Sequence, residues 1–215
     1  MTTNMSISAG IHAFDIHAFE AKSDPWRATK YAQAVDKAIQ QNSAGVASYY
    51  LWRLSSGELH DRNPWIYMLE WNGIVFAACH VDGEAGKYEI KGLIKAPGTR
   101  PYVPRDVVAL AISETFARRG DGIRLDACIR IMPTGWLSQS GLPCTENVPS
   151  RQLFQEFHFE PLHSENVLRF MGDYRDGHLR DSLESDGSYR NRTLVSTPGT
   201  REAARVHLAS RGYFG

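Results

Sequence analysis

The sequence has no excess of charge of either sign and no long hydrophobic run. Its 24 lysine and arginine residues balance 24 aspartate and glutamate residues, so the composition indicates neither nucleic acid nor an anionic membrane surface as a partner. The longest apolar runs, such as residues 74–79, are far shorter than the roughly 20 residues of a membrane-spanning helix. The first ten residues lack the basic and apolar regions of a secretory signal. We therefore expect a cytoplasmic protein without a membrane span.

Cysteine is also scarce, and its three positions, Cys79, Cys128 and Cys144, form an odd set. No two cysteines have CxxC spacing and no two histidines have HxxxH spacing, so we expect no metal site. Cys79 and Cys128 lie in apolar runs, where a free thiol packs as a small hydrophobic side chain. The sequence contains no nucleophile elbow and no Walker-type loop. These absences fit a globular domain in a reducing compartment.

Strong local signals are present in the first half of the chain. Residues 23–25 can cap a helix and place a proline at its first position, and residues 26–41 have the apolar periodicity of that helix. Asn72-Gly73 favours a type I′ hairpin between two β-rich runs, and Asp82-Gly83 predicts the next turn. Three runs read as strands: 46–54, 65–71 and 74–81.

The central stretch has the pattern of a strand, a turn, a helix and a second strand: Tyr88–Lys95, Ala96–Pro104, Arg105–Arg119 and Ile123–Ile131. Both strands are apolar and the helix has one apolar face, which predicts a β-turn-α-β crossover. Such a crossover places the turn against the amino end of the helix, where unpaired N–H groups suit a phosphate. With the preceding hairpin it predicts an α/β (α+β) fold, in which helices flank a mixed, mostly antiparallel central sheet.

The remaining segments divide the chain. Residues 1–24 read as an N-terminal arm, either a poorly ordered lead-in or a docking arm, and residues 25–171 as the main domain. The loop 132–149 is long enough for a binding lid or a disordered segment. Residues 172–215 read as a polar, partly flexible tail, with a turn or two of helix over 201–211. A short helix and two strands are expected to close the main domain: 151–157, 159–161 and 167–171.

Four parts of the chain carry a resemblance to a known family: Gly92-Leu93-Ile94-Lys95 leading to Arg100, the helix Val107–Arg119, the strand Ile123–Ile129, and the run Ser150–Pro161. The last of these is similar to the pattern A-x-x-L-Y-x-x-x-G-F-x-P. In this order the parts resemble the GCN5-related N-acetyltransferase superfamily, and the resemblance spans residues 25–171. It implies transfer of an acyl group from a thioester to an amine.

The resemblance also implies where the donor, acetyl-CoA or another acyl thioester, would bind. The pantetheine arm would lie between two splayed strands and contact the first one at Leu93, Ile94, Lys95 and Ala96. The pyrophosphate would bind at the turn and the helix start through Arg100, Val103, Arg105 and Asp106. Glu89 lies where the family often places a general base, which acts directly or through a water molecule.

Two further residues have side chains suited to acid–base chemistry. His80 has an unperturbed pKa near 6.5, which suits a base, and Tyr102 could act as an acid or as an aromatic wall for a ligand. Each candidate also has an ordinary structural role. Glu89 shares strand parity with two lysines on what could be a solvated face, His80 could be a satisfied strand histidine, and Tyr102 could pack the turn.

The sequence departs from the family pattern at the phosphate turn and in the closing helix. The turn after Arg100 has no glycine and carries two prolines, which lack N–H donors. Phe154 replaces the tyrosine that often protonates the departing thiolate, and His158 replaces a glycine. Three functions therefore stay open: an acyltransferase with an unusual donor such as an acyl-carrier protein, an acetyl-CoA enzyme that binds phosphate through arginine side chains, or a catalytically inactive binding protein. The acceptor would be a small-molecule amine or a protein amine.

Overall fold

The structure is a computed structural model. It describes residues 3–7, 14–42, 63–96, 99, 102–133, 144–146, 148–162, 169–170 and 189–213. The strand predicted over 46–54, the residue Arg100 and most of the loop predicted over 132–149 lie outside these ranges.

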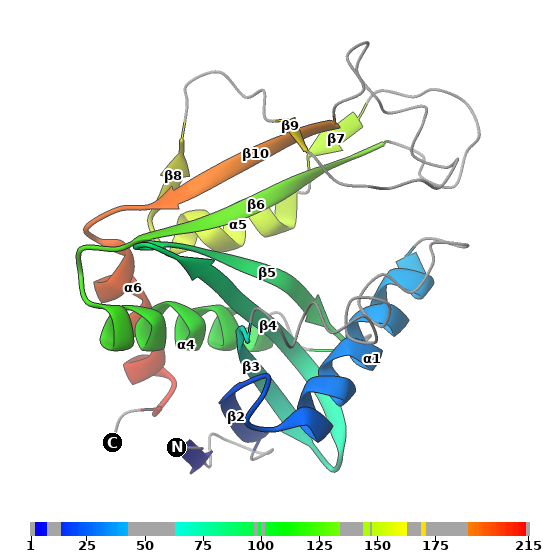
Figure 1. The fold of residues 1–215 in the computed structure, drawn as a ribbon. Helices are drawn as coiled ribbons and strands as arrows, with labels where there is room; N and C mark the ends of the chain where they lie inside the picture. Colours follow the sequence, from blue (N-terminus) through cyan, green and yellow to red (C-terminus); the bar gives the residue numbers. More distant parts are fainter. Residues whose placement is uncertain are drawn as a thin grey trace.

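The strands form one mostly antiparallel sheet in the order β1-β2-β3-β4-β5-β6-β10-β8, with β7 paired to β6 and β9 paired to β10. The pair β5–β6 is parallel, and the other pairs are antiparallel. The strands are β1 (Thr3–Ile7), β2 (Phe14–Glu20), β3 (Trp65–Trp71), β4 (Ile74–Glu84), β5 (Lys87–Lys95), β6 (Arg124–Pro133), β7 (Cys144–Glu146), β8 (Phe159–Pro161), β9 (Arg169–Phe170) and β10 (Tyr189–Ser196). The helices are α1 (Pro25–Asn42), α4 (Tyr102–Arg119), α5 (Val148–Glu156) and α6 (Thr200–Ser210). The mixed sheet with flanking helices confirms the predicted fold class (Figure 1).

Turn chemistry sets the register of the first hairpins. Asn72 and Gly73 have φ values of 48° and 76°, as a type I′ turn requires, so the hairpin between β3 and β4 is confirmed. The loop predicted to open at Asp82-Gly83 and run to Tyr88 is shorter than expected, because β4 continues to Glu84 and the chain reverses at Ala85-Gly86. Those two residues adopt φ values of 50° and 79°. Gly83 is needed for a different reason: a Cβ there would lie 2.2 Å from the carbonyl oxygen of Lys87.

The helix boundaries follow from capping and proline chemistry. Asp24 caps α1, since its Oδ1 accepts a hydrogen bond from the N–H of Arg27 at 3.0 Å. The central helix α4 begins at Tyr102, three residues before the predicted start, because Pro104 fits in a first turn where an N–H is not required. It ends at Gly120, whose φ is 84°.

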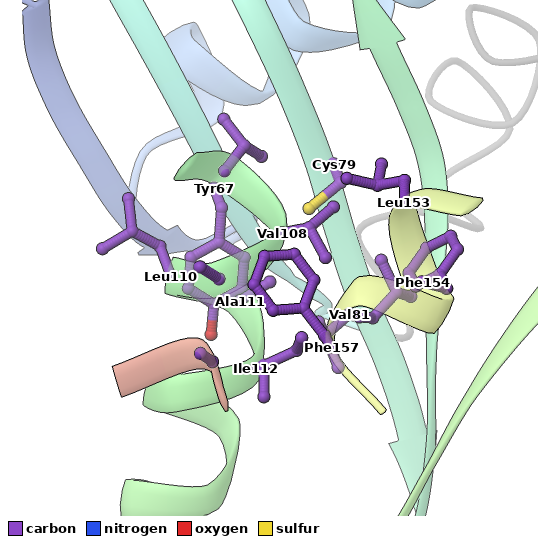
Figure 2. Packing of buried hydrophobic residues seen from close by; sticks show 14 of the residues in the cluster. Tyr67, Cys79, Val81, Val108, Leu110, Ala111, Ile112, Leu153, Phe154 and Phe157 are labelled. Carbon is purple, nitrogen blue, oxygen red and sulfur yellow. The ribbon is translucent and has the colours of Figure 1, made fainter. Parts of the chain in front are cut away.

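Two hydrophobic clusters cover the two faces of the sheet. The larger one joins α4, α5 and α6 to the sheet, and Figure 2 shows its centre, where Tyr67, Cys79 and Val108 pack together. The smaller one joins α1 to the opposite face through residues such as Tyr31 and Met68. Cys79 is a free, buried thiol, as predicted, and burial raises its pKa above the ordinary range.

Both ends of the chain contribute strands to the central sheet, and the C-terminal end also contributes a helix. Within the segment expected as an N-terminal arm, β2 pairs with β3 along six residues. Within the segment expected as a flexible tail, β10 lies between β6 and β8, and α6 packs on α4. A few apolar residues are enough to bury these elements: Leu194 and Leu208 are fully buried and Tyr213 is nearly so. Low overall hydrophobicity therefore hid β10, whereas the helix expected over 201–211 is present as α6.

Candidate functional site

The two strands of the crossover separate partway along their length. The parallel pairing of β5 with β6 joins residues Lys87–Ile90 to Arg124–Ala127. Within these two strands no further pairs follow, although β5 continues to Lys95 and β6 to Pro133. Figure 1 shows them diverging toward the end where α4 begins. The two backbones are therefore unpaired beyond Ile90 and Ala127, as the resemblance implied, and we call the space between these unpaired parts the gap.

A β-bulge bends β5 where this gap opens. His80 of β4 pairs with Lys91 and Ala78 pairs with Ile94, so Gly92 and Leu93 together face the single residue Cys79. Gly92 has a φ of 59°, the left-handed conformation that favours glycine in a bulge. The bulge directs β5 away from β6 and opens the gap.

The bulge also determines which backbone groups of β5 face the gap. The N–H of Ala96 donates to the carbonyl of Phe76 in β4 at 2.8 Å, so it points away from β6. Because N–H groups alternate along the regular strand beyond the bulge, that of Lys95 points toward β6. Of the four β5-end residues predicted to contact a donor, Lys95 therefore offers a backbone donor to the gap.

His80 lies on the α1 face of the sheet and is 1% exposed. Its Nδ1 is 2.8 Å from Oη of Tyr31, and the same Oη is 3.1 Å from the carbonyl oxygen of Gly92. One hydroxyl proton cannot serve both partners. The hydroxyl donates either to the Gly92 carbonyl, with the Nδ1–H of His80 donating to the tyrosine oxygen, or to an unprotonated Nδ1 of His80. The buried His80–Tyr31 pair therefore anchors α1 on the bulge.

Glu89 lies beside the gap on the paired part of β5. Its side chain is 33% exposed, and Oε2 is 3.3 Å from Nζ of Lys91. Across the sheet Glu89 is in register with Asp82 on β4 and with Asp126 on β6. The two neighbouring carboxylates also have cations within 4 Å: Lys91 at 3.6 Å from Asp82, and Arg124 at 2.7 Å from Asp126. Their side chains are 11% and 6% exposed, so Glu89 is the most exposed of the three carboxylates.

The start of α4 differs from a simple phosphate site. Two of the first N–H groups are missing, since Pro101 and Pro104 have none, which leaves those of Tyr102 and Val103. The side chain of Val103 is apolar and buried, so only its backbone N–H could contact a phosphate. Arg105 donates from Nε and Nη2 to Glu156 of α5 at 2.5 and 2.6 Å. This ion pair raises the pKa of Arg105 and lowers that of Glu156.

Asp106 points into the protein and not toward a ligand. The residue is 1% exposed, and its carboxylate receives hydrogen bonds from His207 and Tyr213 at 2.7 and 2.9 Å. Its predicted contact with a phosphate is therefore not available to the side chain. Tyr102 is partly buried, and the guanidinium of Arg211 lies 4.0 Å from the centre of its ring. No local sequence signal had linked residues 207–213 to this end of α4.

Comparison with known proteins gives matches among solved structures alone. No protein-family model matches the sequence, and no curated protein matches it. The RimJ structure from Mycobacterium smegmatis, in complex with CoA-disulfide, has a TM-score of 0.52 at 16% identity and covers 97% of this chain and 94% of that one. A GCN5-related N-acetyltransferase from Brucella melitensis has a TM-score of 0.50 at 12% identity, covering 98% and 89%. This chain has the fold of the GCN5-related N-acetyltransferases.

A third structure of this acetyltransferase fold comes from Salmonella typhimurium. That enzyme modifies the N-terminal serine of the 50S ribosomal subunit protein L7/L12, and it matches with a TM-score of 0.51 at 14% identity, covering 89% of this chain and 98% of that one. Each match extends over most of both chains. The N-terminal strands and the C-terminal elements β10 and α6 therefore belong to the folded unit that is compared.

Two residues that depart from the family resemblance have clear places in the structure. His158 adopts a φ of 58°, a left-handed conformation that favours glycine. Phe154 is 4% exposed and packs edge-to-face on Phe159 with ring centres 5.3 Å apart.

A shallow polar hollow lies at the opposite, closed end of the β5–β6 pair, lined by residues that include Trp65, Tyr88 and Arg118. Arg118 stacks on the Trp65 ring at 3.4 Å from its centre and donates to Oη of Tyr67 at 2.9 Å. Burial raises the pKa of Tyr67 to about 12. Arg118 is also paired with Glu114, so the cation of this hollow already has structural partners. We therefore keep the gap between β5 and β6 as the candidate site.

The part of the chain that the structure describes contains no group of three histidine, cysteine, aspartate or glutamate residues arranged to hold a metal ion. It also contains no helix with the length and hydrophobicity required to cross a membrane.

Proposed function

We propose that this protein is an N-acyltransferase that moves an acyl group from a thioester donor, acyl-CoA or an acyl-carrier protein, to an amine. The observation that carries the proposal is the gap between β5 and β6, which opens after the Ile90–Ala127 pair. The acetyltransferase fold supports it, as does the CoA-disulfide bound to the RimJ match. An extended pantetheine arm in the gap would act as an additional short strand and pair with the N–H of Lys95.

The transfer requires a deprotonated amine and a stabilised oxyanion. The amine nitrogen attacks the thioester carbon, a C–N bond forms, and the carbonyl oxygen becomes negatively charged. We assign a backbone N–H at the end of β5, near residues 94–96, to that oxygen. Glu89 then receives the amine proton through a water molecule, because Glu89 lies several residues before that end of the strand. Collapse breaks the C–S bond, and solvent protonates the thiolate in the absence of a tyrosine at Phe154.

The acceptor is a protein or small-molecule amine. The Salmonella match acts on the N-terminus of a ribosomal protein, which makes a peptide amino terminus the first class of acceptor to test. Glu89 is partly exposed and lies between two other carboxylate-bearing strands. A negatively charged group in that position favours the approach of an ammonium ion before it loses its proton.

A second function is favoured by two features of the site, namely Phe154 in place of an acid and Arg105 already paired with Glu156. These features suit a catalytically inactive protein that binds a partner or a ligand through the same cleft. The two functions differ in whether a thioester is consumed, and a single assay separates them.

The test begins with thermal unfolding in the presence of CoA, acetyl-CoA and a long-chain acyl-CoA. A donor at about 100 times its dissociation constant should stabilise the protein by roughly 2.7 kcal/mol. The stabilising donor is then incubated with a panel of amines that includes peptides with free N-termini, and thiol release is followed. We expect Glu89→Gln to slow turnover while donor binding is retained, and Glu84→Gln, at an exposed position of β4, to have no effect. Donor binding without thiol release on any amine would favour the inactive binding protein.

A further inference from the structure

The C-terminal helix holds the start of α4 through one buried carboxylate. Asp106 accepts hydrogen bonds from His207 Nε2 at 2.7 Å and from Tyr213 Oη at 2.9 Å. Because an ionised carboxylate only accepts, the His207 Nε2 must carry a proton. Burial and the adjacent carboxylate raise the pKa of Tyr213, so its hydroxyl remains a donor. Residues separated by about 100 positions in the chain therefore meet in one network.

Arg211 is the part of this network that reaches toward the surface. Its Nε lies 3.4 Å from Oδ1 of Asp106, and its side chain is 30% exposed. Its guanidinium covers the ring of Tyr102, the first residue of α4, at 4.0 Å. The contact with Asp106 uses Nε, and a guanidinium carries four further N–H groups on its two terminal nitrogens. Arg211 is thus a fixed cation at the start of α4 with donors beyond its structural contact.

The other charge at this end of α4 is already balanced. Arg105 makes a two-point ion pair with Glu156, whereas no second carboxylate pairs with Arg211 among the residues that the structure describes. Proline at positions 101 and 104 also removes backbone donors that a phosphate could use. A phosphate near Tyr102 would therefore depend on a side-chain cation, and Arg211 has the geometry to bind it by two parallel hydrogen bonds.

We propose that Arg211 is a donor-binding residue that contacts a phosphate of the acyl donor, and that Asp106 is the positioning residue that holds Arg211 over Tyr102. The proposal rests on the proposed function, since it assigns the phosphate end of the donor to the start of α4. A phosphate is common to CoA and to the phosphopantetheine arm of a carrier protein. The C-terminal turn would then supply what the proline-bearing turn lacks.

The experiment is titration calorimetry of the full chain with three probes that differ in phosphate content: CoA, 4′-phosphopantetheine and pantetheine. A charge-assisted hydrogen bond contributes enough that Arg211→Gln should weaken CoA binding by about tenfold or more. Pantetheine, which has no phosphate, should bind the variant and the wild type equally. Equal losses for CoA and phosphopantetheine would indicate the phosphate that both share, and a loss for CoA alone would indicate its nucleotide phosphates.

Arg201→Gln is the matched control, because it removes the same charge from the same helix, where Arg201 pairs with the exposed Asp121 at 2.5 Å. It should leave the affinities for all three probes unchanged. Arg211→Lys keeps the charge but loses the planar fork and should fall between the wild type and Arg211→Gln. Unchanged CoA binding in Arg211→Gln, or an equal loss for pantetheine and CoA, would overturn the inference while the proposed function stands. A wild-type protein that binds none of the probes would overturn both.

Discussion

Replacing Asp106 with alanine would leave a histidine, an arginine and a tyrosine hydroxyl without their shared acceptor. The carboxylate is 1% exposed and has His207, Arg211 and Tyr213 as partners. Removal of one partner from a fully buried ion pair costs about 3–5 kcal/mol, and the cost here should lie near the lower figure because the side chains of His207 and Arg211 are 21% and 30% exposed. Since domains unfold with about 5–15 kcal/mol, this substitution alone should remove a large share of the stability.

The control substitution is Asp121→Ala. Asp121 is 74% exposed and pairs with Arg201 of the same C-terminal helix, and an exposed pair of this kind contributes about 0.2–1 kcal/mol. Both variants lose an aspartate that bridges the region of α4 to α6, so they differ chiefly in burial. Urea unfolding followed by circular dichroism, with equal slopes for all proteins, would give the two differences in free energy.

We expect the loss for Asp106→Ala to exceed that for Asp121→Ala by at least about 2 kcal/mol. Tyr213→Phe is a milder variant for the case in which Asp106→Ala does not fold, and it should lose about 1.5–3 kcal/mol with one hydrogen bond to a charged group. If both substitutions in the network cost no more than Asp121→Ala, the network does not hold α4, and the positioning role assigned to Asp106 is wrong.

Two further predictions concern buried histidines. Tyr31→Phe removes the hydroxyl between His80 and Gly92; it should cost about 1–3 kcal/mol in urea unfolding because a buried imidazole nitrogen loses this hydrogen bond, and an unchanged midpoint would contradict the anchoring role. His17 of β2 is buried, and its Nδ1 has no hydrogen-bond partner among the described residues; burial, then the charge of Arg27, lowers its pKa below the ordinary value of 6.5. The unfolded chain therefore binds the proton more readily, so the stabilising effect of a neutral His17 is present above pH 6.5 and is lost as the pH falls below it. Unfolding at pH 7.5 and 5.5 should show a smaller pH-dependent loss in His17→Gln than in the wild type, and equal losses would show that folding does not shift the pKa of His17.

The sequence predicted best those elements that depend on neighbours in the chain. The Asn72-Gly73 hairpin followed from the need for positive φ at two consecutive residues, and α4 followed from apolar spacing closed by Gly120. The splay of β5 from β6 was expected from the resemblance and is present in the pairing. The loop before Tyr88 was predicted to start too early because Gly83, which looked like a turn residue, is a glycine for steric reasons within a strand.

The contacts that hold the start of α4 could not be predicted, because they join Asp106 to residues about 100 positions away in the chain. Nothing near Asp106 in the sequence indicates that His207 and Tyr213 donate to it, and an aspartate in the first turns of a helix ordinarily favours the helix dipole from the surface. The segment from residue 172 onward is poor in aliphatic residues, and this hid β10 and the packing of α6, although a helix over 201–211 was expected. Leu194 and Leu208 are each fully buried, and a central strand position or one helix face needs few such residues.

The same long-range contacts explain how a phosphate turn without glycine can remain useful. In a glycine-rich turn the backbone itself approaches the phosphate, and affinity is a local property of the turn. Here prolines stiffen the approach to α4 and remove donors, so any affinity must come from side chains whose positions are set elsewhere. Arg211 is positioned by Asp106 and Tyr102, and Asp106 is itself fixed by His207 and Tyr213. If Arg211 binds the donor as proposed, donor affinity should therefore depend on the last ten residues, although the proposed transfer takes place on β5.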